Sequence, residues 1–424
     1  MKQSLSIAIV GAGPGGLATA LLLKRRGHDV RVFERFEQAA PVGSGLILQP
    51  TGLSVLAYLG LLPAMLARGA RIDRLTGADA RSGRTVLDVR YDALAGGRFG
   101  LGTHRAALFD VLHDAVVAAR IPIMTGTDAQ SLHAMGDGIG FDASGLRHGP
   151  FDLIVDASGA RSTLRRHAVR PVEPRPLTYG AIWATLDWVG EGFDPNALQQ
   201  RYERAHTMVG VLPVGRVDPA GGEKAAFFWS LKPAEIDAVK AGGLDVWKSR
   251  VFAVWPACAP YLDQITDFDS LTLARYGHHT LLPQRGERIV FLGDAAHATS
   301  PQLGQGANMA LLDAAALDEA LRRSDHLDQA LDVYGALRRN HIKLFQALSL
   351  MLTPFYQSDG RVLPWMRDTL VAVAARVPPV PQILGAMVAG TLLDPLGRIG
   401  LAEPDWTAAA GTMGSAEAPT QEKA

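Results

Sequence analysis

A glycine-rich turn close to the N-terminus has the residue types and the spacing that binding of a phosphate requires. Residues 11–16 are Gly-Ala-Gly-Pro-Gly-Gly, and they stand between two apolar runs. Gly11 permits a tight turn, Gly13 lets the backbone approach a bound group, and Gly16 allows a helix to pack closely. The N-terminus of that helix offers free N–H groups and a positive dipole end. The pattern predicts a strand, a turn and a helix that bind pyrophosphate through Gly11, Gly13, Pro14, Gly15 and Gly16.

An acidic residue follows this turn at the distance where a ribose would lie. Glu34 comes 23 residues after Gly11, at the end of the next apolar run. A carboxylate at this place accepts hydrogen bonds from ribose hydroxyl groups and repels a 2′-phosphate. Residues 6–36 therefore predict a dinucleotide site for FAD or NAD, and they disfavour NADP.

A second motif with similar chemistry lies about two-thirds of the way along the chain. Residues 288–297 are Arg-Ile-Val-Phe-Leu-Gly-Asp-Ala-Ala-His, and the chain continues through Pro301 to Gly-Gln-Gly-Ala-Asn at 304–308. A strand that ends in Gly-Asp places Asp294 at the carboxyl edge of a sheet, where its carboxylate can hold a polyol chain. The later glycines precede a helix, whose N-terminus can face an electron-rich ring. Two such turns with one acidic ribose site indicate one long cofactor that is bound at both ends.

The elements around these motifs are short apolar runs followed by helical spacing, which is typical of parallel strands in an α/β fold. Between residues 176 and 235 the apolar residues alternate instead with a period of two, which predicts an antiparallel sheet. We therefore predict a mixed α/β fold: a Rossmann-like cofactor domain, an inserted and mostly antiparallel sheet domain, and C-terminal helices. The expected ranges are 1–72, 98–175 and 270–340 for the cofactor domain, 73–97 and 176–269 for the inserted domain, 341–404 for the helices, and 405–424 for a disordered tail.

Charge and cysteine content exclude several classes of function. The 424 residues include 42 basic and 42 acidic side chains, whereas a nucleic-acid binder needs a basic surplus. The single cysteine, Cys258, excludes an internal disulfide framework and suits the cytoplasm, and we interpret it as a packing residue. No histidine pair has the spacing and carboxylate company of a metal site, so we predict none.

Val377–Leu393 is apolar but contains three prolines, so we expect no transmembrane helix and a segment that packs on its own domain or touches a membrane surface.

Taken together, these motifs resemble the FAD-dependent monooxygenases of the para-hydroxybenzoate hydroxylase and salicylate hydroxylase type. The resemblance covers roughly residues 1–360. It is strongest in Gly11–Gly16 with Glu34 and Arg35, in His104-Arg105-Ala-Ala-Leu108, and in Gly-Asp-Ala-Ala-His at 293–297 with the glycines at 304–308. Residues 43–50, Gly-Ser-Gly-Leu-Ile-Leu-Gln-Pro, resemble the loop beside the isoalloxazine ring.

The resemblance implies that the bound dinucleotide is FAD and that the cofactor domain is an FAD-binding domain. Arg105 would contact the phosphate and ribose region, Asp294 would hold the ribityl chain, and the backbone of residues 306–308 would face the flavin pyrimidine. With the first turn, the implied FAD contacts also include Glu34, Arg35, Gly45, Pro301, Gly304, Gly306, Ala307 and Asn308.

The resemblance also implies a reaction. NADH or NADPH would bind transiently and reduce FAD, O₂ would add at the flavin C4a, and the hydroperoxide would transfer one oxygen atom to an aromatic or other apolar electron-rich substrate. The sequence identifies no catalytic acid or base, and His297, directly after Asp294-Ala-Ala, is interpreted as a structural hydrogen-bonding group. One residue departs from the family: Ser158 stands where the family has Asp in Ala-Asp-Gly, and an acid is displaced to Asp156.

The substrate is expected between the flavin and the antiparallel sheet. Trp183, Phe228 and Trp229 are aromatic residues of that sheet that could line an apolar pocket, and Gln49 stands near the flavin loop. Few polar groups are available there, which favours an aromatic or otherwise apolar small molecule over a highly charged one.

Other functions remain open on the sequence. A hydroxylase of the ubiquinone-precursor type would act at a membrane surface, and the Phe355–Asp359 stretch resembles part of that subgroup. Ser158 also leaves open a flavin-binding protein or an oxidase without hydroxylation driven by NAD(P)H. A flavin halogenase is disfavoured because its Trp-x-Trp-x-Ile-Pro segment is absent. We expect a monomer or a homodimer.

Overall fold

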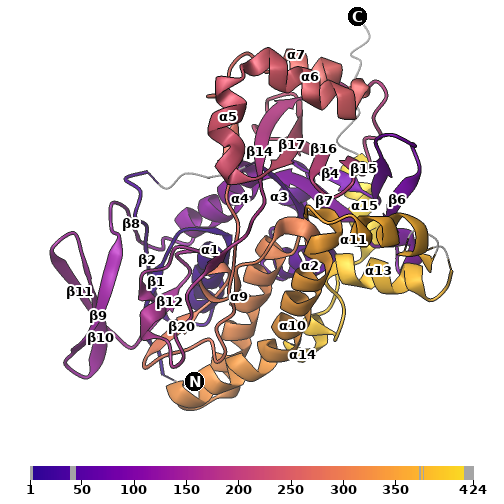
Figure 1. Ribbon diagram of the computed structural model, residues 1–424. Coiled ribbons are helices and arrows are strands. Elements are labelled where there is room, and N and C mark those ends of the chain that lie inside the picture. The colour runs from indigo at the N-terminus through magenta and orange to yellow at the C-terminus, as the bar shows by residue number, and fades with distance from the viewer. Residues whose placement is uncertain (1–2, 39–43, 372–373, 376, 415–424) are drawn as a thin grey trace, which may run out of the picture.

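The central layer of the molecule is a parallel β-sheet. The computed structural model describes residues 3–38, 44–371, 374–375 and 377–414 (Figure 1). Within them, five strands pair in parallel in the order β20-β12-β1-β2-β8. Helices and a small sheet bury both faces of β1 and β12, which is why these strands are continuous apolar runs. The bounds are β1 Ser6–Val10, β2 Asp29–Phe33, β8 Ile123–Met124, β12 Leu153–Asp156 and β20 Ile289–Phe291.

Helices cover one face of this sheet. α1 packs against α4 and α9, and their apolar sides form the largest core cluster together with the sheet. A Cβ on Gly15 would lie 2.8 Å from Leu292 Cδ1 and 3.1 Å from Ala310 Cβ, so glycine is what permits α1 to approach α9 this closely. The bounds are α1 Pro14–Arg25, α2 Pro50–Tyr58, α3 Leu62–Leu66, α4 Arg105–Ala118, α9 Gly306–Arg323 and α10 Leu327–Tyr356.

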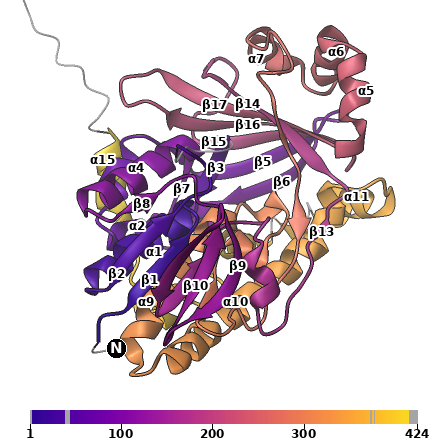
Figure 2. The same cartoon turned by 90° about the vertical axis from the view of Figure 1, so that its left-hand side faces the viewer.

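A small antiparallel sheet covers the opposite face. Phe141 and Phe151 of this sheet pack against Phe33 with ring centroids 4.9 and 5.8 Å apart, and the same cluster contains Val10 and Ile154 of the central sheet. Figure 2 shows these strands in front of the central sheet. The expected cofactor range 98–175 contains them, although the sequence analysis did not identify them as strands. They are β9 Ala129–Met135, β10 Gly138–Ala143 and β11 Leu146–Phe151.

A second large sheet has the order β18-β14-β17-β16-β15-β5-β6. Neighbouring strands are antiparallel except β15 and β5, so two segments more than 100 residues apart build one sheet. Three short helices cover its outer face (Figures 1 and 2). The bounds are β5 Arg74–Asp79, β6 Thr85–Arg90, β14 Gly180–Asp187, β15 Ala197–Glu203, β16 Thr207–Arg216, β17 Glu223–Leu231, β18 Thr272–Ala274, α5 Ile236–Ala241, α6 Leu244–Val254 and α7 Ala259–Asp263.

Two small ladders connect the large sheets. β7 pairs antiparallel with β3 and β4, and a Cβ on Gly102 of β7 would lie 2.1 Å from the carbonyl oxygen of Pro213, so glycine permits β7 to touch β16. β13 and β19 pair where the chain enters and leaves the second sheet. The bounds are β3 Gly45–Leu48, β4 Ala70–Ile72, β7 Gly100–His104, β13 Arg175–Pro176 and β19 Gly277–His278.

The C-terminal region is helical further than expected. The sequence analysis predicts a disordered tail from residue 405, but Trp406–Gly414 forms helix α15, and residues 415–424 lie outside the described part. Trp406 is buried against Phe99, and its Nε1 donates to Glu403 Oε2 at 2.7 Å, so one aromatic anchor fixes this helix. No described helix is both long and apolar enough to cross a membrane. The preceding helices are α11 Val362–Met366, α13 Val380–Ala389 and α14 Pro395–Arg398.

Candidate active site

The first glycine turn has the shape of an anion site. Gly11 has a φ of +105°, and a Cβ on it would lie 2.5 Å from the carbonyl oxygen of Ala157, so both conformation and space require glycine. Around Gly13 the space is open, because a Cβ there would have no described neighbour within 4 Å. No described side chain caps the N-terminus of α1, and its first turn contains no acid. Its N–H groups are therefore available to a bound phosphate.

Glu34 lies at the rim of this turn. Its Oε2 accepts from the Ala12 N–H at 2.8 Å and its Oε1 accepts from the Phe36 N–H at 3.1 Å, which fixes the carboxylate beside the glycines. Each oxygen keeps a lone pair that can accept from a ribose hydroxyl. Arg35 is exposed, with its guanidinium 4.6 Å from the Phe36 ring centroid.

The ladder of β3 and β7 brings together Gly45 and Arg105, which are 60 residues apart. Gly45 pairs with His104, and the Arg105 N–H donates to the Ser44 carbonyl at 3.0 Å. His104 Nδ1 caps α4 by accepting from the Ala106 N–H at 3.1 Å. The Arg105 side chain is left exposed at the start of the helix, free to contact an anionic ligand.

The second motif forms the opposite end of the candidate site. Asp294, the first residue of α8 (Asp294–His297), is exposed, and its Oδ1 lies 3.9 Å from the position of a Cβ on Gly306. Pro301 is exposed, Gly304 has a φ of +61°, and α9 begins at Gly306 without a side-chain cap among the described residues. The carboxylate and the uncapped helix are thus neighbours.

Asn308 fixes this turn through its side chain. Its Oδ1 accepts from the Gln49 N–H at 2.8 Å, and its Nδ2 donates to the carbonyls of Ile47 and Gly304 at 3.1 and 2.9 Å. The Asn308 side chain is buried and hydrogen-bonded to protein atoms. The groups of Asn308 and its neighbour Ala307 that could contact a cofactor are therefore their backbone atoms.

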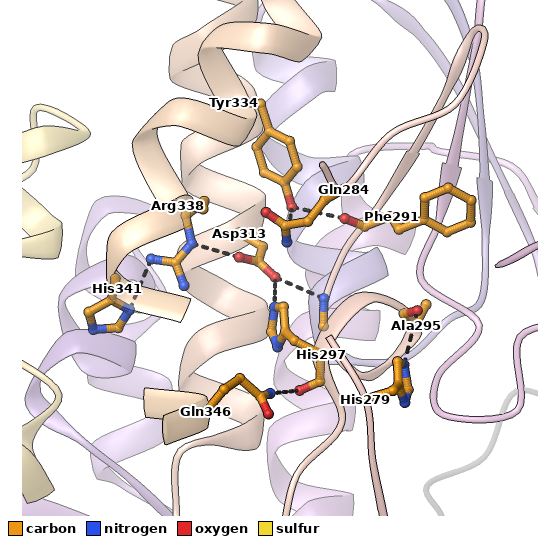
Figure 3. A network of polar contacts seen from close by, with 11 residues as sticks. His279, Gln284, Phe291, Ala295, His297, Asp313, Tyr334, Arg338, His341 and Gln346 are labelled. Atoms are coloured by element: carbon orange, nitrogen blue, oxygen red, sulfur yellow. Dashed lines mark hydrogen bonds and ion pairs between the residues drawn. The ribbon is translucent and has the colours of Figure 1, made fainter. Parts of the chain in front are cut away.

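A buried ionic network supports the turn from behind (Figure 3). Asp313 of α9 lies between His297 Nε2 at 2.5 Å and Arg338 Nε at 2.6 Å, and it accepts from the Gly293 N–H at 2.9 Å. Burial acts to raise the pKa of Asp313, but the charges of His297 and Arg338 outweigh it and hold the pKa below its usual value. His297 is 2% exposed, so this placement supports a structural role and not contact with a substrate.

Two more histidines flank this network. His341 Nε2 lies 3.0 Å from the Gly390 carbonyl and its Nδ1 lies 3.2 Å from Arg338 Nη1. Burial, together with the charge of Arg338, lowers the pKa of His341 to about 3. Burial and the charge of Arg165 lower the pKa of His279 to about 4, so both histidines are neutral near pH 7.

Ser158 has a local hydrogen-bonding role. Asp156 is fully buried at the end of β12, and its Oδ1 accepts from the Ser158 hydroxyl at 2.6 Å and from the Ser158 N–H at 2.9 Å. The Ser162 hydroxyl donates to Asp156 Oδ2. Burial raises the pKa of Asp156, and these hydrogen bonds partly offset that effect. Asp156 and Ser158 therefore belong to one hydrogen-bonded turn. Ala157 of this turn lies against Gly11.

Gln49 has an unpaired donor next to the second glycine turn. Its side chain is fully buried, and its Oε1 accepts from the Tyr91 hydroxyl at 2.5 Å. Its Nε2 has no partner among the described residues and lies 3.5 Å from the position of a Cβ on Gly304. A buried amide N–H of this kind is costly unless a ligand accepts from it.

The sheet residues predicted to meet the substrate lie on two different faces. Trp183 and Phe228 are cross-strand partners whose ring centroids are 4.7 Å apart, on the face without the covering helices. Trp229 is on the other face, buried against Trp247 of α6 at 5.8 Å, because successive residues of a strand alternate. The structure therefore separates Trp229 from the other two, and we do not retain it as a substrate contact.

Sequence reasoning missed Tyr276. Its hydroxyl accepts from Trp183 Nε1 at 3.1 Å, and burial raises its pKa while Trp183 and the charge of Arg105 act to lower it. On the same face, Thr185 Oγ1 lies 3.1 Å from His104 Nε2. The aromatic face of β14 therefore lies beside the start of α4. No sequence pattern indicated Tyr276, because it belongs to a short irregular segment.

These groups fit FAD. A diphosphate, a polyol and a polar ring would use four features of this site. These are the two uncapped helix N-termini, the open space at Gly13, the exposed carboxylate of Asp294 and the unpaired Gln49 Nε2. Among the described residues no group of three or more His, Cys, Asp or Glu side chains could hold a metal ion.

Known proteins share this architecture. Residues 4–347 match the model of a family described as FAD binding domain. The chain is 32% identical to a 3-amino-4-hydroxybenzoate 2-monooxygenase of Streptomyces cremeus, over 80% of this chain and 84% of the other. It is 28% identical to an aurachin C monooxygenase/isomerase of Stigmatella aurantiaca, over 88% and 94%. These two relatives match most of their own length.

Two solved structures have the same fold. A tetrameric 2-methyl-3-hydroxypyridine-5-carboxylic acid oxygenase aligns with a TM-score of 0.76 at 21% identity, over 93% of this chain and 98% of the other. Klebsiella pneumoniae HpxO in complex with FAD and uric acid aligns with a TM-score of 0.77 at 20% identity, over 91% and 97%.

Proposed function

The chain belongs to the FAD binding domain family of flavin-dependent monooxygenases, and from this premise we propose that it hydroxylates an aromatic small molecule with one oxygen atom of O₂, using NADH or NADPH as reductant. The relative from Streptomyces cremeus acts, by its name, on 3-amino-4-hydroxybenzoate, an aromatic compound, which supports this substrate class. We further propose that the protein works in the cytoplasm.

The residues of the site would hold the cofactor and orient the substrate. When bound, FAD supplies the redox chemistry of hydride acceptance and oxygen activation. The start of α1 and Glu34 would bind its diphosphate and ribose, Arg105 would neutralise phosphate charge, and Asp294 would accept from the ribityl hydroxyls. The uncapped start of α9 would stabilise negative charge on the reduced ring.

One observation supports the aromatic substrate above all. Trp183 and Tyr276 form a hydrogen-bonded pair on the face of β14 that lies beside Arg105's helix. The Trp183 ring can pack against an aromatic ring, and the Tyr276 O–H, which accepts from Trp183, keeps its own hydrogen for an oxygen of the substrate. Phe228 closes the apolar surface behind Trp183.

The test is spectroscopic and kinetic. Purified protein should be yellow or become yellow on addition of FAD, and rapid mixing with NADH or NADPH should bleach the flavin faster in the presence of the true substrate. A compound library can be screened for stimulated NAD(P)H oxidation with formation of a product that contains one added oxygen atom. If FAD binds but neither nicotinamide reduces it with any compound, a flavin-binding protein or an oxidase is the better description.

A second candidate is a hydroxylase of prenylated rings at a membrane surface. Val362 and Trp365, one turn apart on α11, are 67% and 60% exposed, and such apolar side chains suit an interface with lipid. Sedimentation with liposomes tests it: binding that Trp365→Ser abolishes would favour this candidate, and a wholly free protein would exclude it.

A further inference from the structure

A cavity lies between α10 and the segment that leads into the second sheet. Its volume is about 230 Å³. Leu177 and Tyr179, directly before β14, form one wall, and Leu350 and Pro354 of α10 form another. Ser300, which precedes Pro301, and His278, two residues after Tyr276, complete it. An apolar cavity of about 150 Å³ holds benzene, so this one has room for one ring or two fused rings.

Three hydroxyl groups on the wall, those of Ser300, Ser349 and Thr353, are already paired. Ser300 Oγ and Thr353 Oγ1 are 2.8 Å apart, Thr353 Oγ1 also donates to the Ser349 carbonyl at 2.6 Å, and Ser349 Oγ accepts from Thr299 Oγ1 at 2.5 Å. The Tyr179 hydroxyl donates to Asp359 Oδ1 at 2.8 Å, outside the wall. These hydroxyl groups satisfy their hydrogen-bonding capacity within the protein, so they offer few hydrogen bonds to a ligand.

Gln357 provides a buried side-chain oxygen that lacks a partner among the described residues. It ends α10, lines the cavity and is 5% exposed, yet its Oε1 has no hydrogen-bond partner among the described residues. A buried amide oxygen normally finds a donor. A ligand with an N–H or O–H group would supply it.

The wall contains no fixed charge. Of the described residues that line the cavity, only His278 and Tyr179 can ionise. Burial, with the charge of Arg175, lowers the pKa of His278, so it is neutral near pH 7. Burial raises the pKa of Tyr179 above its usual value, so the phenol keeps its proton. A carboxylate ligand would therefore lose its hydration without gaining a counter-charge.

We propose that this cavity binds the substrate of the hydroxylation reaction, an uncharged aromatic molecule of one or two rings that donates a hydrogen bond to Gln357. The proposal rests on the proposed function, because it names the substrate class of the same site. Its place fits that role: Tyr179 directly precedes the strand that contains Trp183, His278 follows Tyr276 by two residues, and Ser300 directly precedes Pro301 in the segment that leads to the Gly304 turn.

Probe molecules test the site without turnover. Indole is neutral, has two fused rings and one N–H donor; 1-methylindole lacks the donor, and indole-3-carboxylate adds a charge. Calorimetric titration of the FAD-loaded protein should show indole binding about 3- to 10-fold more tightly than 1-methylindole, the range expected of one buried hydrogen bond, with indole-3-carboxylate weakest. Gln357→Leu should remove the preference for indole over 1-methylindole. Tighter binding of the carboxylate would overturn the proposed substrate class.

A second variant tests the cavity itself. Leu350 lines it and is 53% exposed, so Leu350→Trp should block the opening and weaken both neutral probes by more than about 10-fold without disturbing the core. Met351, 58% exposed and outside the wall, provides the matched control, and Met351→Trp should bind indole as the wild type does. Equal binding by Leu350→Trp and the wild type would overturn the proposal.

Failure of this proposal and failure of the proposed function give different results. Flavin content and reduction by NADH or NADPH are measured on the same preparations. If NADH or NADPH reduces the flavin normally but Leu350→Trp and Gln357→Leu leave probe binding unchanged, the cavity proposal is rejected and the monooxygenase function is retained. Loss of flavin reduction in the wild type, with probe binding that still responds to these variants, rejects the function and retains the site.

Discussion

His297 Nε2 lies 2.5 Å from Asp313 Oδ2, so a buried pair joins the end of the Gly-Asp-Ala-Ala-His motif to the middle of α9. The same carboxylate holds the Gly293 N–H and Arg338. The turn that presents Asp294 is therefore fixed from the side opposite to the candidate cofactor site. This arrangement has consequences for stability and for cofactor binding.

Asp313→Asn should strongly destabilise the protein. Arg338 is 1% exposed, and removing its counter-charge leaves an uncompensated buried cation, which costs about 3–5 kcal/mol. Urea unfolding followed by circular dichroism measures the loss. Asp325→Asn, an exposed acid in the α9–α10 connection, is the control and should change stability by no more than about 0.5 kcal/mol. Similar curves for the two variants would contradict a stabilising role of the network.

His341 should make stability depend on pH. Its pKa is about 3 in the folded protein against an ordinary 6.5, so below pH 6.5 the unfolded chain binds a proton that the folded protein does not. The unfolding free energy should therefore fall as pH decreases from 6.5 towards 3, by up to about 1.4 kcal/mol per pH unit from this group.

His341→Gln should flatten that decline, because glutamine takes up no proton. Chemical unfolding at several pH values between 7 and 4 measures the slope. His326→Gln, an exposed histidine at the start of α10, should leave the slope as in the wild type. An unchanged slope in His341→Gln would show that another group takes up the proton.

Asp294→Ala and Arg105→Ala should each weaken FAD binding about 10- to 100-fold, the range for a lost hydrogen bond to a charged group. Both side chains are exposed at helix starts, so folding should be little affected. Titration of apoprotein with FAD, followed by flavin fluorescence, gives the dissociation constants. Asp114→Ala on the exposed side of α4 is the control. Wild-type affinity in both variants would remove these contacts from the proposed site.

Gln49→Leu should weaken FAD binding about 3- to 10-fold and shift the visible absorption of the bound flavin, because the unpaired Nε2 lies beside the Gly304 turn. Tyr91→Phe removes the group that orients Gln49 and should have a smaller effect in the same direction. Gln130→Leu, exposed on β9, should have neither effect. A wild-type spectrum and affinity in Gln49→Leu would place its amide away from the cofactor.

The sequence by itself determined the parts of the site whose conformation is local. Gly11 must be glycine because its own φ is positive, and Asp294 must lie at a sheet edge because it follows the end of a buried strand by three residues. The Gly-Asp and Gly-Gln-Gly segments, with Glu34, indicated the family, and the family match confirms it. The local period of two also placed Trp183 and Phe228 in strands.

Only the tertiary structure decided which of these residues meet. Alternation separates Phe228 from Trp229, but the packing of α5–α7 decides which face is covered, so spacing could not exclude Trp229. Three contacts join separate segments of the chain. They are the pairing of β5 with β15, the hydrogen bond between Trp183 and Tyr276, and the buried contact between Asp313 and His297. Such contacts depend on many weak packing interactions across the whole core. The spacing of residues within one segment therefore does not determine them.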